Sequence, residues 1–214
     1  MAEKREKPAP KSRSRDGGDK RERILRAAIK VFAKHGFYAT RVSEIAKEAG
    51  VADGTIYLYF KNKDDVLISI FDDRIRKLIE LLERLTSEAK TTEERLRSII
   101  EVQLGLFEGE RELAEVVTVN LRQSSKLLKQ YASPLFNEYL GLIARVIAEG
   151  QAEGTVRDDL SPRLLARAMW GGLDGIALNW TLGGGGPEKL RIAAKQYAEF
   201  YWSGIVARAA ENTH

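Results

Sequence analysis

The stretch that decides the fold runs from Ile24 to Leu67 and reads ILRAAIKVFAKHGFYATRVSEIAKEAGVADGTIYLYFKNKDDVL. Its apolar residues recur at helical spacing up to Gly36, which we expect to end the first helix. A second short helix ends at Gly50, and a tight connection leads to a third over about residues 54–60. Two short helices joined by a tight turn predict a helix-turn-helix unit.

The third of these helices carries side chains suited to reading DNA. In a helix-turn-helix this helix lies in the major groove, where its first residues meet base edges. Gly54 lets the helix start approach the phosphate backbone closely, and free N–H groups there favour an anion. The groove-facing side chains are predicted to be Thr55, Tyr57, Leu58 and Tyr59, with Lys61 and Lys63 reaching phosphates. The alternative is an ordinary helical hairpin whose tyrosines are half-buried packing.

The rest of the chain reads as helix, so the predicted fold class is all-α with about nine helices. Asn62 is placed to cap a long helix that starts near Lys63. Another helix is expected over residues 127–151, kinked at Pro134. The predicted organisation is a disordered basic arm (1–18), a three-helix DNA-binding domain (19–66) and a ligand-binding and dimerisation bundle (67–210).

Composition excludes several classes of protein. Of 214 residues 43% are apolar, and cysteine is absent, which rules out disulfides and thiolate metal sites. Only two histidines occur, so a metal site or a Ser-His-Asp triad would rest on His35, and we expect no metal and no cofactor. No apolar run is long enough to span a membrane and no secretory signal is expected, which fits a cytoplasmic protein.

The positive charge is concentrated at the start of the chain. Residues 1–23 hold nine Lys or Arg and five Asp or Glu, a surplus of four that equals the net charge of +4 for the whole sequence. Such an arm suits a polyanion, although a solvated tail has the same composition. RNA or a membrane surface is therefore an alternative partner. An enzyme is disfavoured, because the glycine-rich run at 183–186 lacks the lysine and the preceding strand of a phosphate-binding loop.

Within residues 24–67 the sequence resembles the DNA-binding domain of the tetracycline-repressor (TetR) family. The recurring residues are Ala28, Phe32, Gly36, Thr40, Ile45, Ala46, Ala49, Gly50, Val51, Gly54, Tyr57, Phe60, Lys63 and Leu67. The resemblance implies a dimeric transcriptional repressor that a small molecule releases from its operator. It also implies DNA contacts by Thr40, Arg41, Gly54, Thr55, Tyr57, Tyr59 and Lys63.

Three positions depart from that family pattern. Ala52 stands where Ser or Thr often caps the recognition helix, so Asp53 is expected to cap it instead and to join the DNA-facing set. Leu58 and Tyr59 stand where an aromatic residue and a histidine are common. Because the last two positions face the groove, the operator sequence of other family members does not carry over.

A narrower resemblance joins residues 50–65, GVADGTIYLYFKNKDD, with residues 119–125, VNLRQSS. Both are similar to the TetR-type regulators of fatty-acid degradation (FadR), which implies long-chain acyl-CoA as the effector. An acyl chain needs an apolar tunnel, and its CoA head needs cations and donors at the mouth. The candidate lining is Leu104, Phe107, Val116, Val119, Asn120, Trp170, Leu173 and Ile176, with Arg122 and Gln123 for the head. The alternatives are that these residues are ordinary core, or that the ligand is a drug.

The last two helices carry two long apolar stripes. Helices with small residues among bulky ones can pack against a symmetry mate as a four-helix interface. The candidate interface residues are Leu165, Met169, Leu173, Trp180, Tyr197, Phe200, Tyr201 and Ile205. A two-fold homodimer would place two recognition helices about 34 Å apart, so the double-stranded target should be a palindrome. The alternative is that both stripes face only their own core.

Overall fold

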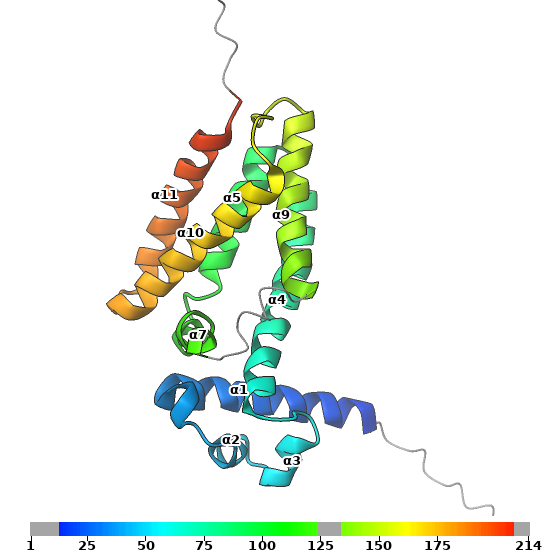
Figure 1. The fold of residues 1–214 in the computed structure, drawn as a ribbon, viewed down its shortest axis with the longest axis vertical. Helices are drawn as coiled ribbons and strands as arrows, with labels where there is room; N and C mark the ends of the chain where they lie inside the picture. The colour runs from blue at the N-terminus through cyan, green and yellow to red at the C-terminus, as the bar shows by residue number, and fades with distance from the viewer. Residues whose placement is uncertain (1–12, 124–133, 208–214) are drawn as a thin grey trace, which may run out of the picture.

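The computed structural model describes residues 13–123 and 134–207. Within these residues the fold is all-α, as predicted, with only an isolated antiparallel bridge between Val156 and Val206 outside the helices. Three helices form a unit at one end, and a long helix connects this unit to a larger bundle (Figure 1). No helix in the described part of the chain is long and apolar enough to cross a membrane.

The N-terminal unit consists of α1 (Arg13–Ala39), α2 (Val42–Ala49) and α3 (Asp53–Tyr57). Gly36 interrupts α1 with φ 74° and ψ 164°, a backbone conformation that side chains other than glycine rarely adopt. The core of the unit is formed by the fully or nearly fully buried side chains of Ile24, Phe32, Ile45, Ile56 and Phe60. The predicted helix-turn-helix is therefore present.

Three local predictions differ from the structure. The first helix begins at Arg13 rather than Asp19, because extending an existing helix fixes only one residue for each new hydrogen bond. The prediction for residues 1–12 lies outside the described residues. The helix expected over residues 54–60 ends at Tyr57, and its N-cap is Ala52, which places Asp53 in the first turn instead of the cap.

The long helix α4 (Lys63–Glu88) joins the two parts of the molecule. The side-chain oxygen of Asn62 accepts a hydrogen bond from the N–H of Asp65 at 2.9 Å, which is the predicted cap. Asp64 and Asp65 lie in the first turn, where the helix dipole favours negative charge.

The bundle continues with α5 (Thr92–Gly105) and then with an unbroken helical run. That run comprises α6 (Arg111–Glu115), a π-helix η1 (Val116–Asn120) and α7 (Leu121–Gln123). The chain ends with α9 (Pro134–Ala152), α10 (Pro162–Gly183) and α11 (Pro187–Ile205). If α6, η1 and α7 count as one helix, the described residues contain the predicted nine.

Pro134 is the first residue of α9, so the predicted kink inside a longer helix is wrong. Proline favours the first turn of a helix because its missing N–H would have no partner there. The expected helical residues 127–133 lie outside the described part of the chain.

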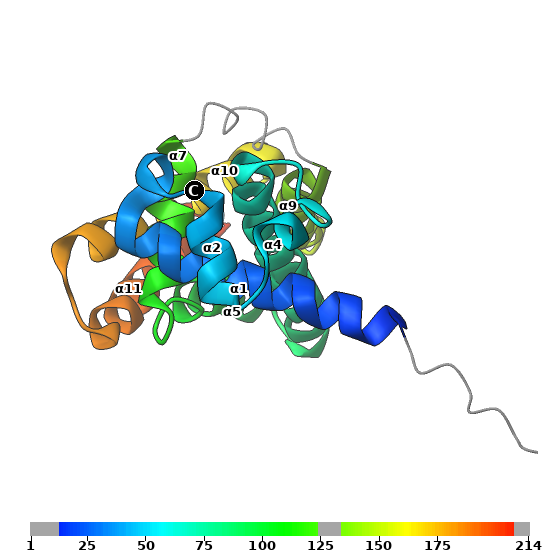
Figure 2. The ribbon, with the colours of Figure 1, turned by 90° about the horizontal axis from the view of Figure 1, so that it is seen from below.

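Seen from below, α1 and α2 lie across the end of the bundle, with α11 toward one side and α9 toward the other (Figure 2). The α6–η1–α7 run packs directly on α1, so it forms a second connection beside α4.

Candidate DNA-binding surface and effector cavity

The outer surface of the helix-turn-helix presents two large apolar side chains to solvent. Tyr57 is 58% exposed and Leu58 is 81% exposed, at the end of α3. The other predicted DNA-facing residues that are exposed are Arg41, Asp53, Gly54 and Lys61. A leucine and a phenol held side by side can contact thymine methyl groups and phosphate oxygens in a major groove.

Three other predicted DNA-facing residues lie deeper in the N-terminal unit. Thr55 and Tyr59 are half-buried, and the ring of Tyr59 packs against that of Phe60. Thr40 is buried, and its hydroxyl donates to the carbonyl oxygen of Gly36 at 2.8 Å. The prediction that the Thr40 side chain contacts DNA is therefore wrong, because its hydroxyl is buried and hydrogen-bonded at the end of α1.

Lys63 also has partners inside the protein. Its ammonium donates to the carbonyl oxygens of Tyr38 at 3.0 Å and Thr40 at 2.9 Å, and it lies 4.7 Å from the ring centroid of Phe37. These carbonyls end α1, where the helix dipole attracts a cation. Two of its three N–H donors thus join α4 to α1, which leaves one for a phosphate.

A cavity of about 110 Å³ lies where α4, α5, the α6–η1–α7 run and α10 meet. Of the predicted lining residues, Leu104, Phe107, Trp170 and Leu173 belong to it. The sequence analysis missed the wall from α4, formed by Phe71, Ile75 and Leu78. Their helical spacing was the available signal, but it is shared by ordinary core residues.

The polar edge of this cavity contains an ion pair. The guanidinium of Arg122 donates to the Asp174 carboxylate and to the carbonyl oxygen of Thr118, and both Asp174 and Thr118 line the cavity. Burial raises the pKa of the Asp174 carboxyl, and the charge of Arg122 opposes that shift. Arg122 itself does not line the cavity, so the predicted free cation for CoA phosphates is instead paired.

The remaining predicted lining residues point elsewhere. Val116 and Asn120 are buried. The side chain of Asn120 faces Gly36 in α1: a Cβ added to Gly36 would lie 3.8 Å from the Oδ1 of Asn120. Val119, Gln123 and Ile176 are also absent from the lining, whereas Val117 and Thr118 are present. For Val119, Asn120 and Gln123 the physical reason is the π-helix η1, which adds a residue to the turn and rotates the side chains of the run away from α-helical positions. Ile176 lies on α10, where Leu173, Asp174 and Ala177 line the cavity instead.

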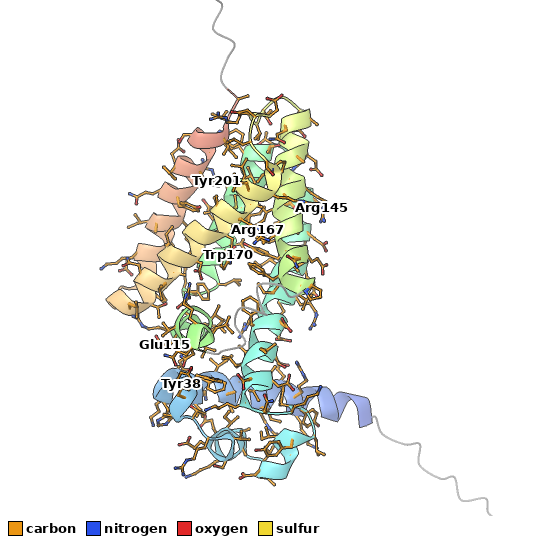
Figure 3. All side chains as sticks on the ribbon, in the orientation of Figure 1. Tyr38, Glu115, Arg145, Arg167, Trp170 and Tyr201 are labelled. Carbon is orange, nitrogen blue, oxygen red and sulfur yellow. The ribbon has the colours of Figure 1, made fainter. Side chains whose placement is uncertain are left out.

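The α6–η1–α7 run also touches the DNA-binding unit. The hydroxyl of Tyr38 donates to the main-chain oxygen of Gln123. Figure 3 shows Tyr38 on the N-terminal unit and Glu115 above it on this run. The same three-part run therefore lines the cavity on one side and packs on α1 on the other.

Most of the predicted interface residues belong to the core of their own protomer. Met169 and Leu173 are fully buried, which makes their assignment to a dimer interface wrong. Tyr201 donates to the carbonyl oxygen of Leu165 at 2.9 Å, a bond that ties α11 to α10. The further predicted residues that are buried here are Trp180 and Ile205. Periodicity alone could not show which apolar face of each helix turns inward.

A different apolar surface remains exposed on these two helices. Phe200, from the predicted set, is 72% exposed, and Tyr197 beside it is half-buried and stacks on it with ring centroids 6.3 Å apart. Leu164, which belongs to the apolar stripe of α10, is exposed as well. Two further exposed side chains, which the sequence analysis did not single out, are Leu182 and Ile192. This set of large apolar side chains is suited to contact with a second protein surface.

Comparisons with known proteins give these surfaces a context. Residues 24–70 match the family described as "Bacterial regulatory proteins, tetR family", and residues 71–199 match "YsiA-like protein, C-terminal region". The chain is 38% identical to the fatty acid metabolism regulator protein of Bacillus subtilis over 159 residues, which is 74% of this chain and 82% of that protein.

Two solved structures are similar over almost their whole length. FadR from Bacillus subtilis in complex with stearoyl-CoA has a TM-score of 0.79 and 35% identity, covering 86% of this chain and 98% of that one. FadR from Bacillus halodurans, described as a fatty acid degradation regulator, has a TM-score of 0.78 and 33% identity with the same coverage. The chain belongs to the TetR family of transcriptional regulators and is closely related to the FadR regulators of fatty-acid degradation.

Proposed function

We propose that this protein is a homodimeric repressor of fatty-acid degradation genes that long-chain acyl-CoA releases from a palindromic operator. Residues 19–66 read the DNA, and residues 67–210 bind the effector and form the dimer, in the cytoplasm where the operator is. Arg41, Gly54, Tyr57, Leu58 and Lys61 make the DNA contacts. The similarity to FadR, including the structure with stearoyl-CoA, supports the acyl-CoA assignment.

The observation that carries the proposal is the position of the cavity. Its walls come from α4 and from the α6–η1–α7 run, and both of these elements also pack on α1. An effector that enters the cavity therefore acts on the two elements that hold the DNA-binding unit. A ligand can shift the operator equilibrium only if it binds one shape better than the other.

The size of the cavity indicates how an effector could prefer one conformation over the other. At about 110 Å³ it is smaller than the roughly 300–1,000 Å³ of a typical ligand pocket. We propose that the surrounding helices move apart when a long acyl chain enters. We therefore assign the described conformation to the DNA-binding state and a wider one to the acyl-CoA complex.

Gel-shift titration tests the proposal. Full-length protein is bound to the palindromic duplex found by selection from random DNA, and stearoyl-CoA, stearate and unacylated CoA are added separately. Release by micromolar stearoyl-CoA alone supports the proposal. Release by none of them, or only by a hydrophobic drug, would show that the effector is of another class.

A further inference from the structure

A second hollow lies between α9 and the first turns of α10, outside the apolar cavity. Its volume is about 720 Å³, and it is open to solvent. The lining combines small or apolar residues with polar and basic ones: Asn137, Leu140, Gly141, Ala144, Arg145, Ala148, Ser161, Pro162, Arg163 and Arg167. We call it the arginine groove. No carboxylate is among its described lining residues, so its charge is positive.

The arginines of this groove differ from many others in the molecule. Arg95, Arg122 and Arg157 each form an ion pair with a carboxylate. Within residues 13–123 and 134–207, by contrast, Arg145, Arg163 and Arg167 have neither an ion pair nor a side-chain hydrogen bond, and all three are exposed. Their guanidinium donors are therefore available to an external anion.

The start of α10 adds to the positive potential. Asp and Glu occupy the first turns of α4, α5 and α11, where they balance the helix dipole. The first turn of α10 holds no acid and instead carries Arg163, while the Ser161 side chain makes no capping hydrogen bond. A cation at the positive end of a helix is unfavourable unless an anion lies nearby.

One face of α10 runs from this groove into the apolar cavity. Arg163, Arg167, Trp170 and Asp174 follow at i, i+4, i+7 and i+11, which places them in one line. The two arginines line the groove, and Trp170 and Asp174 line the cavity. The whole line covers about 16 Å of helix. Figure 3 shows Arg167 and Trp170 on α10 and Arg145 on the neighbouring α9.

The boundary between groove and cavity is aromatic. The ring of Trp170 meets that of Phe136, from α9, edge-on with centroids 5.1 Å apart. Phe136 also packs on Phe71 of the cavity wall, with ring centroids 6.2 Å apart, and its neighbour in the chain is the groove residue Asn137. A ligand with its apolar tail in the cavity and its anionic head in the groove would lie beside this pair.

From these observations we infer that the arginine groove binds the phosphate groups of acyl-CoA while the acyl chain occupies the cavity. The inference rests on the proposed function and names the part of the protein that recognises CoA. Arginine forks bind phosphate oxygens through paired, charge-assisted hydrogen bonds. The flexible pantetheine arm separates the thioester from the phosphates, which matches a head site that lies beyond Trp170. Arg122 has no such role, because Asp174 and Thr118 already hold its guanidinium.

The test is isothermal titration calorimetry on the full chain with stearoyl-CoA and with stearate. The variant R163Q/R167Q removes two charges from the groove and keeps both side chains polar. We expect it to bind stearoyl-CoA about 10- to 100-fold more weakly, because charge-assisted hydrogen bonds to the phosphates are lost. Binding of stearate should be unchanged, because the cavity is intact.

A matched control removes two exposed arginines of α4 that line neither space. The variant R76Q/R84Q should bind stearoyl-CoA like the wild type, and unfolding in urea should show that all three proteins are equally stable. Equal weakening in both double variants would overturn the inference, as would unchanged affinity in R163Q/R167Q. Failure of the wild type to bind stearoyl-CoA at all would instead refute the proposed function itself.

Discussion

The phenol of Tyr38 in α1 donates a hydrogen bond to the main-chain oxygen of Gln123 in α7. It is a direct polar contact between the DNA-binding unit and the run that lines the effector cavity. Tyr38 is otherwise 72% exposed, and its ring packs edge-on against Phe37. The bond belongs to the narrow-cavity conformation, so it opposes any movement that separates α7 from α1.

Removing that bond should make the repressor more sensitive to its effector. Tyr38→Phe keeps the ring and removes a bond of about 0.5–1.5 kcal/mol. We expect half-release from the operator at a stearoyl-CoA concentration about 2- to 10-fold lower than for the wild type, measured by fluorescence anisotropy of labelled operator. Operator affinity without effector serves as the control. An unchanged or higher release concentration would mean that the bond does not distinguish the two states.

The exposed apolar side chain of Leu58 should matter for DNA and not for folding. Leu58→Ala removes a side chain that is 81% exposed, so the free energy of unfolding should change by less than about 0.5 kcal/mol. Because a dimer presents this residue twice, about 1 kcal/mol for each copy predicts a roughly 30-fold loss of operator affinity. Glu80→Ala, an exposed change on α4, is the control. Operator affinity equal to that of the control would remove Leu58 from the DNA-binding surface.

Phe200 should be required for self-association. Phe200→Glu places a carboxylate in an exposed apolar surface, and burying that charge against a second copy is strongly unfavourable. We expect the dimer dissociation constant to rise by at least about 100-fold in sedimentation equilibrium, with loss of operator binding. Phe200→Leu, which keeps the surface apolar, should remain dimeric. A Phe200→Glu protein that dimerises normally would place the interface elsewhere.

Gly172 is needed for the close approach of α11 to α10. A Cβ at this position would lie 2.2 Å from the hydroxyl oxygen of Tyr197, far inside contact distance. That hydroxyl shares its one hydrogen between the carbonyl oxygens of Ala168 and Met169, at 3.1 Å each, so the ring cannot rotate away without losing this contact. We expect Gly172→Ala to lower the free energy of unfolding by about 1–3 kcal/mol in urea denaturation. In a Tyr197→Ala background the same change should have almost no effect, and an additive double variant would contradict the clash.

The hydroxyl of Tyr197 should also make stability depend on alkaline pH. Burial raises its pKa from 10.0 to about 12, so the folded state retains a proton that the unfolded state loses. The stabilisation is complete below pH 10 and disappears as pH rises from 10 toward about 12. Tyr197→Phe cannot ionise, so its stability deficit at neutral pH should shrink over that range. A deficit that stays constant in urea titrations at each pH would exclude this ionisation.

The sequence determined the fold class and the position of the DNA-binding unit. Gly36 interrupts α1, Gly50 ends α2, Asn62 caps α4, and Ile56 and Phe60 turn inward. Each of these features depends on neighbours a few residues away. Local rules of this kind act through backbone conformation and helical spacing, which a sequence carries directly. The break before α11 at residues 183–186 follows from the same rules.

Only the tertiary structure decided which apolar faces turn inward and which cations remain free. Met169 and Phe200 look equivalent as apolar residues on helices, yet one is buried and the other is largely exposed. Arg122 is neutralised by Asp174, 52 residues away in the chain, while Arg163 and Arg167 have no such partner among the described residues. Burial and ion pairing depend on contacts between distant segments, and a π-helix in the middle of a run shifts the side chains after it. Helical periodicity contains no information about burial or about ion pairing between distant residues.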